Sequence, residues 1–544
     1  MVESTDSEQP QTADNNKESG PQSEIGGRYA KYVLGVLILV YVFNFIDRQI
    51  LSILAEDIKA DIGITDAEIG FLYGTAFAVF YAVFGIPLGK LADTWIRKNL
   101  ISLGLLFWSV MTALSGTARG FGALATFRIG VGIGEASATP AAFSMLSDYF
   151  PPRLRATALA VYSSGVYIGG GIGIFLGGII LDSWASLYPD TSVAPFQLKG
   201  WHVAFFAVGI PGILMALWVA TLKEPLRGQS DGIVTPTEPH PFRETFKVLA
   251  ALLPGTNIYE LLRNGAGVKG VIINLVGLVV ILIVCGLLYR VTESTAQWAA
   301  LAIGLYASFS WAQNLAYSDP ATFGMIFHSK AIMYSVIGFP SIAFVGYGIG
   351  FWGPPFFQRV HQVSAAETGI VLGLSTAVGG WMGVTLGGVI TDQLREKYAR
   401  SKFYVGMATV IFCFPVAVGM LMTENLTVAY VLFFFFSITS AMWIGPAAST
   451  INDLVMPRMR AISSAFYILM VTFIGLALGP YTIGYLSDTF AASGPDSAEA
   501  LRQAMIWGTS MLGLALVTLY LASRHVAVDE SSKLERARAL GEPV

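Results

Sequence analysis

Long apolar runs separated by short polar segments form the dominant pattern of this chain. Fourteen runs have about the length that crosses a bilayer, roughly 20 residues. They fall near 31–53, 68–90, 99–118, 122–146, 156–181, 203–222, 270–289, 296–317, 331–357, 368–391, 403–422, 427–452, 461–487 and 504–523. The pattern predicts an all-α polytopic membrane protein with fourteen spans.

Composition agrees with this interpretation and narrows the candidate chemistry. Of 544 residues, 54% are hydrophobic and 13% are charged, whereas soluble domains carry about 25% charged residues. A net charge of −3 does not indicate a nucleic-acid partner. Cys285 and Cys413 lie in separate runs and all five histidines lie outside the runs. We therefore expect no disulfide, no metal site and no cofactor.

Basic residues in the short loops set the expected orientation. Lysines and arginines cluster at 90–98, 153–155, 395–402 and 458–460, whereas the loop 56–68 is acidic. Because basic loops stay on the cytoplasmic side, we expect a multi-pass protein of the cell membrane with both termini in the cytoplasm.

The chain carries an internal duplication. The segment 67–74 (AEIGFLYG) recurs at 366–373 (AETGIVLG) with an offset of 299, and 152–156 (PRLRA) recurs at 457–461 (PRMRA) with an offset of 305. Several matches in one order predict two six-helix bundles related as parallel repeats, with the substrate path between them.

The repeats define the expected domains. We predict a disordered tail at 1–28, an N-terminal bundle at 29–223, a C-terminal bundle at 330–524 and a tail at 525–544. The connector at 224–329 holds an interfacial helix and two extra spans. Those two spans have no internal charge, which favours a packing or lipid-facing role.

Away from the ends of the apolar runs, only four formally charged residues fall inside them: Asp47, Arg48, Arg128 and Glu135. Charges at membrane depth are costly, so they mark candidate functional sites. With about 1.5 Å of rise per residue, Asp47 and Arg128 each lie ~9 Å inside the expected outer ends of their spans. Asp47 and Glu135 are the candidate proton acceptors. The alternative is a static ion pair that locks the two spans together.

Arg128 is the leading candidate to bind an anionic group, because its planar fork suits one. Arg48 points about 100° away from Asp47 and ranks second. We expect Tyr162 and Trp352 to line the same cavity, although helix packing is the alternative for both. Glycines at 130, 132 and 134 should clear space for a neighbour or a substrate. The proline-containing segments 352–355 (WGPP) and 445–446 (GP) should break or kink their helices.

A loop motif lies between the second and third runs. It comprises Gly89, Asp93, Arg97 and Lys98. Its spacing resembles the cytoplasmic loop of the major facilitator superfamily, which implies that these residues take part in gating. The second copy keeps Asp392, also assigned to gating, but has Glu396 in the place of Arg97.

Within that superfamily, the chain resembles the Spinster family. The residues that carry the resemblance are Phe43–Arg48 (FNFIDR) and Arg128–Ala136 (RIGVGIGEA). The resemblance implies transport of amphipathic lipids such as sphingosine-1-phosphate or lysophospholipids, with coupling to protons.

We therefore expect a monomeric, proton-coupled secondary transporter of an amphipathic anionic lipid, surrounded by membrane lipids. The charge-free spans of the second half favour such a substrate over the alternative, a soluble organic anion such as a sugar acid. An enzyme would need a nucleophile with a base, or a metal cluster, and the sequence contains no such pattern. A sensor would not need the duplicated, glycine-rich architecture.

The orientation can be tested by labelling single cysteines at Pro10 and Glu535 in intact cells. Both positions should resist an impermeant reagent applied from outside, since both tails lie on the side of the basic loops. Labelling at either position would overturn the topology.

Overall fold

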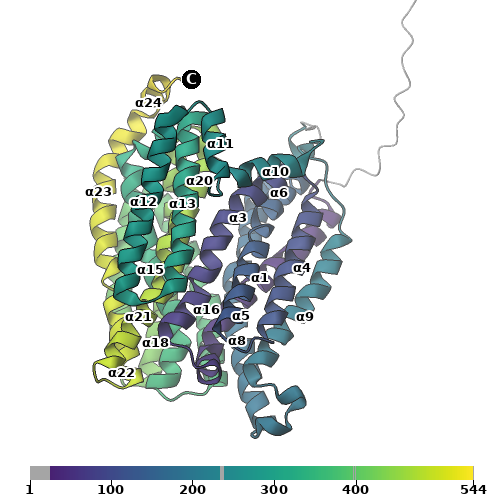
Figure 1. Ribbon diagram of the computed structural model, residues 1–544, viewed down its shortest axis with the longest axis vertical. Helices are drawn as coiled ribbons and strands as arrows, with labels where there is room; N and C mark the ends of the chain where they lie inside the picture. Colours follow the sequence, from purple (N-terminus) through teal and green to yellow (C-terminus); the bar gives the residue numbers. More distant parts are fainter. Residues whose placement is uncertain (1–24, 233–237, 396, 399, 543–544) are drawn as a thin grey trace, which may run out of the picture.

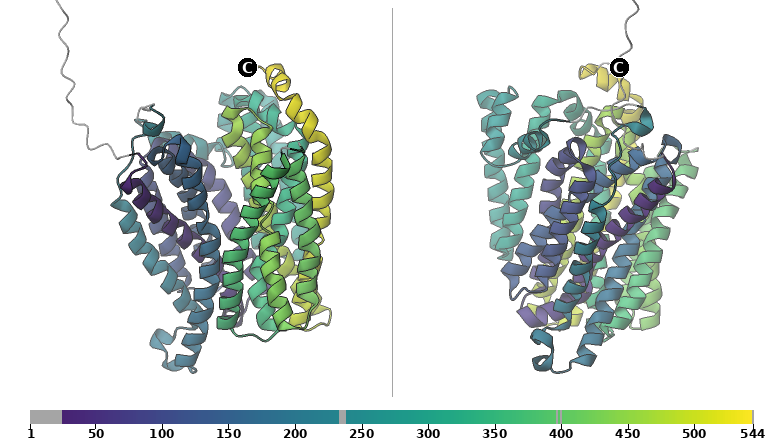
Figure 2. Two further views of the ribbon diagram at one scale, coloured as in Figure 1. Left: turned by 180° about the vertical axis from the view of Figure 1, so that it is seen from behind. Right: turned by 90° about the vertical axis from the view of Figure 1, so that its right-hand side faces the viewer.

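The computed structural model describes residues 25–232, 238–395, 397–398 and 400–542, and the described chain is helical throughout. Residues 1–24 of the predicted tail at 1–28, and Glu396, lie outside these residues. Two helical halves lie side by side, with a connector across one flank (Figures 1 and 2). The described chain begins and ends at one end of the bundle, near α10, α11 and α24, which we call the termini end. The other end is the opposite end.

The first half contains α1 (Arg28–Ile62), α2 (Asp66–Tyr73), α3 (Thr75–Thr94), α4 (Arg97–Ser115), α5 (Phe121–Glu135), α6 (Ala138–Tyr149), α7 (Pro152–Ser163), α8 (Gly165–Leu187) and α9 (Gly200–Ala220). The connector contains α10 (Pro241–Ala250), α11 (Thr256–Arg263), α12 (Gly267–Thr292), α13 (Thr295–Ser318) and α14 (Pro320–Phe327). Short 3₁₀ turns lie at Thr191–Val193, Pro195–Gln197 and Gln229–Asp231.

The second half contains α15 (Lys330–Val360), α16 (Ala365–Arg395), α17 (Ser401–Met422), α18 (Leu426–Thr439), α19 (Ile444–Asp453), α20 (Arg460–Met470), the π-helical η5 (Val471–Ala477), α21 (Leu478–Ala492), α22 (Ser497–Gly508), α23 (Met511–Ser531) and α24 (Lys533–Ala539). A 3₁₀ turn at Pro457–Met459 precedes α20. The chain predicted as a tail from residue 525 is thus helical as far as Ala539.

The structure does not confirm the expected number of spans. Twelve helical segments of the described residues are long and apolar enough to cross a membrane, so the prediction of fourteen crossings is not confirmed. The two segments outside this set are α13 and the pair α5 and α6, which is interrupted at residues 136–137.

Proline acts differently in the two predicted kinks. Helix α15 is continuous through Pro354 and Pro355, so the first of the two segments, expected to break or kink its helix, does not break it. Both prolines are buried, and packing by neighbouring helices can replace a lost backbone hydrogen bond. The chain does break between α18 and α19, directly before Gly445 and Pro446, as predicted.

Glycines let the two halves meet closely. A Cβ built on Gly171 of α8 would lie 2.3 Å from the carbonyl oxygen of Gly373 in α16, and one on Gly373 would lie 2.6 Å from that of Gly171. A Cβ on Gly70 of α2 would lie 2.6 Å from the carbonyl oxygen of Pro480 in α21. No side chain fits at these distances, so both seams between the halves require glycine.

Each half also caps a helix of the other. The carboxylate of Asp488 in α21 accepts hydrogen bonds from the amides of Asp66 (3.0 Å) and Ala67 (2.7 Å) at the start of α2. The carboxylate of Asp182 in α8 accepts one from the amide of Ala366 at the start of α16 (2.8 Å). Ala67 and Ala366 are equivalent in the duplication. These caps satisfy amides that a helix start leaves unpaired.

Arg359 adds an ion-pair cluster at the same end. Its guanidinium donates to Glu56 at 2.6 and 2.8 Å and to Asp66 at 2.7 and 2.8 Å. Lys59 also pairs with Asp66. Within the described residues, every hydrogen bond and ion pair that joins the two halves lies toward the opposite end. Hydrogen bonds and ion pairs therefore fasten the two halves together at the opposite end. Among the described residues, none of these interactions joins the halves at the termini end.

The α12–α13 hairpin is held together by polar side chains and lies over a seam. Asn257 donates to Tyr306 (2.9 Å) and Asn274 donates to Gln313 (2.8 Å). A Cβ on Gly304 of α13 would lie 2.8 Å from Val79 of α3 and 2.9 Å from Phe473 of η5. Helix α13 thus contacts both halves, whereas the span formed by α12 is only 11% buried.

Ion pairs at the termini end hold the last helices in place. Arg458 donates to Asp319 at 2.7 Å and pairs with Glu542. Partial burial would raise the pKa of Asp319, but hydrogen bonds from Arg458 and Thr322 outweigh it and lower the pKa to about 2. The carboxylate therefore stays charged at neutral pH.

Replacing Arg359 with Gln should weaken the fastening of the opposite end. Charge-assisted hydrogen bonds contribute about 1.5–3 kcal/mol, so the population with a separated opposite end should rise at least tenfold. The measurement is the distance distribution between spin labels at Thr191 and Ser493, exposed in different halves, in a background without Cys285 and Cys413.

The matched control is Arg502→Gln, because Arg502 pairs only within its own helix, with Glu499 (2.8 Å). It should leave the distances unchanged. Unchanged distances in Arg359→Gln would show that the glycine seams and the caps hold the end closed without this cluster.

Candidate functional site

The four charges of the apolar runs meet as two crossed ion pairs between α1 and α5. Arg48 Nη2 lies 2.7 Å from Glu135 Oε2, and Arg128 Nη1 lies 3.3 Å from Asp47 Oδ1. Each helix contributes one acid and one base. The sequence placed Asp47 and Arg128 at one depth, and the structure brings them into contact; it also pairs Arg48 with Glu135.

Helix geometry explains the crossed arrangement. Asp47 and Arg48 are adjacent, so their side chains leave α1 about 100° apart and reach different partners. Glu135 lies seven residues, or two turns, beyond Arg128 on one face of α5. The expected depth of Asp47 was wrong: α1 runs on to Ile62, which places Asp47 ~22 Å from that end at 1.5 Å per residue.

Neighbouring polar groups and one ring support the pairs. The hydroxyl of Thr112 in α4 donates to the carboxylate of Asp47. Arg48 also donates to the amide oxygen of Asn44 at 3.4 Å. The guanidinium carbon of Arg48 lies 4.3 Å from the centre of the Phe77 ring, a distance at which a cation is attracted to a ring face.

The site is enclosed but retains unused hydrogen-bonding groups. Arg128 and Glu135 are fully buried, Asp47 is 2% exposed and Arg48 is 7% exposed. Oε1 of Glu135, Nε of Arg48, and Nε and Nη2 of Arg128 have no partner among the described residues. Buried polar atoms of this kind are uncommon. These four charged side chains, which we call the quartet, can therefore accept a proton or an anionic group without first losing every existing hydrogen bond or ion pair.

The glycines of α5 clear space for neighbouring helices, which is the first of the two alternatives that we expected, and not for a substrate. A Cβ on Gly130 would lie 2.7 Å from Met111, and one on Gly132 would lie 2.5 Å from the carbonyl oxygen of Phe77. These glycines admit neighbouring helices, as in other close membrane packings.

Tyr162 and Trp352 lie in different surroundings. Tyr162 is buried and stacks on Tyr41, with ring centres 4.5 Å apart; Tyr41 lies two turns before Arg48 on α1. Trp352 is buried near the opposite end, where its Nε1 donates to the carbonyl oxygen of Pro480 (2.8 Å). Its neighbour Arg359 belongs to the fastening cluster. Both contacts lie within the second half, so the structure places Trp352 beside Arg359 of the ion-pair cluster and not with the four charges.

The first loop motif divides into two parts. Arg97 is fully buried, pairs with Asp148, and lies 2.7 Å from Glu224 through its Nε. Lys98 donates its backbone amide to the same glutamate at 3.0 Å. These contacts join α4 to α6 and to the start of the connector, all on one side of the molecule.

Gly89 and Asp93, the other part of the motif, lack such contacts within the described residues. A Cβ on Gly89 would have nothing within 4 Å. Asp93 is exposed and forms no ion pair with the described residues. Both lie at the termini end, where the halves are unfastened, so they are accessible to a second contact.

The second copy of the loop motif supplies a basic residue equivalent to Arg97 from another position in the sequence. Comparison of the two motifs did not reveal this. Asp453, equivalent to Asp148 at the offset of 305, pairs with Lys402 and with Arg395 (2.8 Å). Lys402 is equivalent to Arg97 at that same offset. Glu396 lies outside the described residues, and Asp392 is exposed without an ion pair among them.

Sequence reasoning missed the residues whose partners lie far away in the chain. Thr112 and Phe77 gave no signal, because hydroxyl groups and rings are common in spans. Arg359, Asp182 and Asp488 are charges at helix ends. The acidic loop 56–68 was the one available signal that a cation should approach the opposite end.

No metal-binding group is formed by the described residues: nowhere do three His, Cys, Asp or Glu side chains gather closely enough for one.

Comparisons with known proteins place this geometry in a family. The sequence profile of the Major Facilitator Superfamily matches residues 37–480. An MFS-type efflux pump of Mycolicibacterium smegmatis is 24% identical over 520 residues, covering 94% of this chain and 98% of the relative. The sphingosine-1-phosphate transporter SPNS2 of Danio rerio is 23% identical over 499 residues, covering 89% and 80%.

A further relative matches only part of the chain. A Bacillus subtilis protein described as a probable galactarate/D-glucarate transporter is 31% identical over 201 residues, covering 36% of this chain and 41% of the relative.

The fold has a solved counterpart. The crystal structure of a bacterial homologue of the human lysosomal transporter Spinster, in an inward-facing and occupied conformation, matches with a TM-score of 0.67 and 27% identity. The match covers 92% of this chain and 98% of that one. This multi-pass membrane protein, which is similar to Spinster proteins, belongs to the Major Facilitator Superfamily.

Proposed function

We propose that this transporter moves an amphipathic anionic lipid, such as a lysophospholipid or a sphingolipid-like molecule, by proton-coupled alternating access. The observation that carries the proposal is the enclosed, electrically neutral quartet of two carboxylates and two guanidiniums. Breaking one buried ion pair leaves an uncompensated charge, at a cost of about 3–5 kcal/mol. A proton and an anion arriving together avoid this cost.

Glu135 is the group that we assign to proton binding, with Asp47 as the second carboxylate. Among the described residues Oε1 of Glu135 has no partner, whereas Asp47 accepts from both Thr112 and Arg128. A proton on Glu135 weakens its hold on Arg48 and leaves the quartet with one net positive charge. Arg48 is then available for an anionic group.

Arg48 is also the more accessible arginine, which reverses the ranking expected from the sequence. Its side chain is 8% exposed, whereas that of Arg128 is fully enclosed beside Asp47. We assign the headgroup contact to Arg48 and a positioning role to Arg128. Tyr162 supports the site through its stacking on Tyr41, and Trp352 contributes by packing against Arg359, whose guanidinium binds Glu56 and Asp66 of the first half.

The surroundings of Arg48 favour an amphipathic substrate. Its guanidinium lies within 4.6 Å of the ring centres of Phe45 and Phe77 and 5.3 Å from that of Tyr81. Aromatic walls suit an acyl chain better than a polyhydroxylated acid. The likeness to a sphingosine-1-phosphate transporter supports the same substrate class.

A soluble sugar acid is the second candidate, and the partial match to the galactarate/D-glucarate protein favours it. The quartet would bind either anion, since both present a negative group. The length of the apolar part of the substrate distinguishes the two candidates.

The gating and topology assignments are part of the same proposal. Gly89 and Asp93, with Asp392 in the second copy, are free to contact the other half when the termini end closes, while Arg97 and Lys98 keep their loop in place. We propose that α13 and the α5–α6 pair also cross the cell membrane, giving fourteen spans with both termini cytoplasmic, in a monomer.

Replacing Glu135 with Gln should remove the pH dependence of transport while the protein still folds, since Gln has nearly the same shape. Uptake of a fluorescent lysolipid into proteoliposomes, measured across roughly pH 5 to 8 to bracket a perturbed carboxylate, is the readout. The matched control is Glu424→Gln, an exposed residue at the opposite end, which should behave as wild type.

The comparison variant is Asp47→Asn. If Asp47→Asn loses the pH dependence and Glu135→Gln keeps it, the assignment of the two carboxylates is reversed. If both variants keep it, the quartet is a structural lock and not the site of coupling.

Arg48→Lys should weaken substrate binding by about 1–3 kcal/mol, because lysine keeps the charge but loses the fork. Arg128→Lys should mainly lower the melting temperature, since this side chain is fully enclosed. Binding of a lysolipid and of glucarate to each purified variant provides the measurement. Tighter binding of glucarate than of the lysolipid by the wild type would favour the second candidate.

A further inference from the structure

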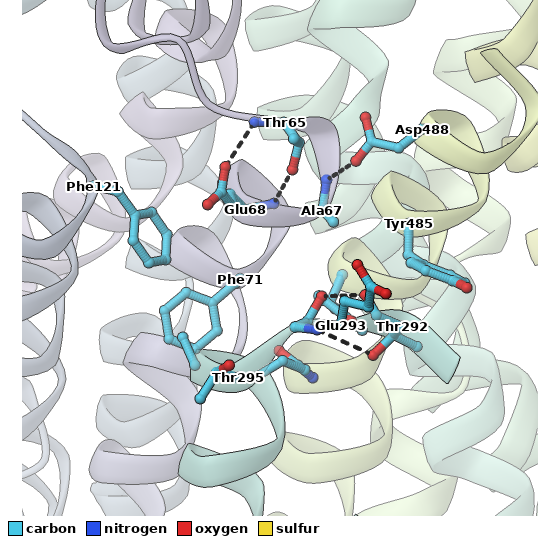
Figure 3. A pocket seen from close by; sticks show the side chains of 14 residues that line it. Thr65, Ala67, Glu68, Phe71, Phe121, Thr292, Glu293, Thr295, Tyr485 and Asp488 are labelled. Carbon is cyan, nitrogen blue, oxygen red and sulfur yellow. Dashed lines mark hydrogen bonds between the residues drawn. The ribbon is translucent and has the colours of Figure 1, made fainter. Parts of the chain in front are cut away.

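A pocket opens at the opposite end, away from the four charges. It has a volume of about 500 Å³ and lies where α2, the start of α5, the α12–α13 turn and α21 meet (Figure 3). Sites for small ligands typically measure about 300–1,000 Å³. The pocket therefore has the size of a ligand site, and the connector hairpin supplies one of its walls.

Charges of one sign line this pocket. Glu68, Glu293 and Asp488 contribute carboxylates, and none of the lining residues is basic. Glu68 accepts from the amide of Thr65 (2.9 Å), and Asp488 caps the start of α2. The carboxylate of Glu293 has no hydrogen bond or ion pair with the described residues. A cleft lined by one sign of charge attracts the opposite sign.

Aromatic rings make up much of the remaining wall. Phe71 and Phe121 lie with ring centres 5.7 Å apart, and Tyr481 and Tyr485 lie 6.3 Å apart and nearly parallel. In Figure 3 the two phenylalanines lie on the side away from Tyr485 and Asp488. Rings combined with carboxylates are the surroundings that organic ammonium groups bind. The described carboxylates do not form a metal-binding group, which favours a larger, organic cation.

Gln297 is an independent sign of a ligand. It lines the pocket, it is 1% exposed, and neither its amide oxygen nor its amide nitrogen has a hydrogen-bond partner in the part of the chain that the structure describes. Native structures rarely leave both ends of a buried amide unpaired. A bound molecule with a hydroxyl or an N–H group would satisfy it.

We propose that this pocket binds a small organic ammonium ligand with a hydroxyl group, and that the bound ligand favours the conformation fastened at the opposite end. Glu68 and Asp488 belong to different halves, so the pocket loses a wall when the halves separate there. A ligand that binds one conformation more tightly shifts the equilibrium toward it. This inference does not depend on which substrate the quartet binds.

Choline is the probe, because it joins a trimethylammonium group to a hydroxyl. It should raise the melting temperature of the purified wild-type protein in a dose-dependent way. The neutral isostere 3,3-dimethylbutan-1-ol, at equal ionic strength, should not. Equal effects of the two compounds, or stabilisation by Ca²⁺ but not by choline, would overturn the proposal.

Two variants separate a ligand site from a structural cluster. Glu293→Asn removes the unpaired charge, and asparagine tolerates the positive φ of 55° at this position. This variant should raise the dissociation constant of choline about tenfold, as expected for the loss of one charged contact. The matched control Glu424→Asn, at an exposed loop of the same end, should not change it.

Gln297→Met provides the sharper test. Removing an unpaired buried amide should raise the melting temperature of the protein without ligand, while the stabilisation by choline is lost. A lower melting temperature with choline binding retained would show that Gln297 is structural and would overturn its role as a ligand contact.

The coupling to conformation has its own readout. Choline should increase the population with a short distance between spin labels at Thr191 and Ser493 in the wild type, and should not do so in Gln297→Met. An unchanged distance distribution with choline bound would overturn the conformational part of the proposal.

Discussion

The burial of four charges between two helices is the constraint on which the first half of this molecule depends. In an apolar environment each charge needs a partner of opposite sign, and the crossed pairs of α1 and α5 satisfy all four at once. The requirement fixes the rotation of both helices, because Asp47 and Arg48 point in different directions. It also explains the glycines of α5, which bring α3 and α4 close enough for Phe77 and Thr112 to reach the charged groups.

The second organising feature is the pseudo-symmetric fastening of the opposite end. Gly178 and Gly484 each precede a capping aspartate by four residues, and a Cβ on either would clash with backbone of the other half, at 2.1 and 2.2 Å. Asp182 and Asp488 then cap equivalent helices. Two seams with the same chemistry hold the halves together, and the Arg359 cluster lies between residues of both halves at this end.

The sequence predicted the class of fold, the duplication and the four site residues, because apolar periodicity and charge at membrane depth are local signals. It left an ion pair between the two spans as an alternative but did not assign which acid pairs with which base, since the pairing depends on helix rotation. The role of Lys402 was missed because the repeat offset changes from 299 to 305 inside the loop, so alignment at a single offset pairs Arg97 with Glu396. The caps at Asp182 and Asp488 join segments distant in the chain, and nothing local distinguishes them from ordinary helix-end charges.

The duplicated fastening has a consequence for how the protein tolerates change. Each aspartate holds only one of two equivalent seams, so losing either leaves its counterpart and the glycine contacts in place. The contacts that join the halves at the opposite end are thus duplicated. The quartet is not duplicated, because none of its members has a counterpart in the second half. Substitution of one capping aspartate at a time should therefore be tolerated. Substitution of the four charged residues in α1 and α5 should not be. The duplication thus provides two copies of the contacts that join the halves at the opposite end, but only one copy of the buried charges.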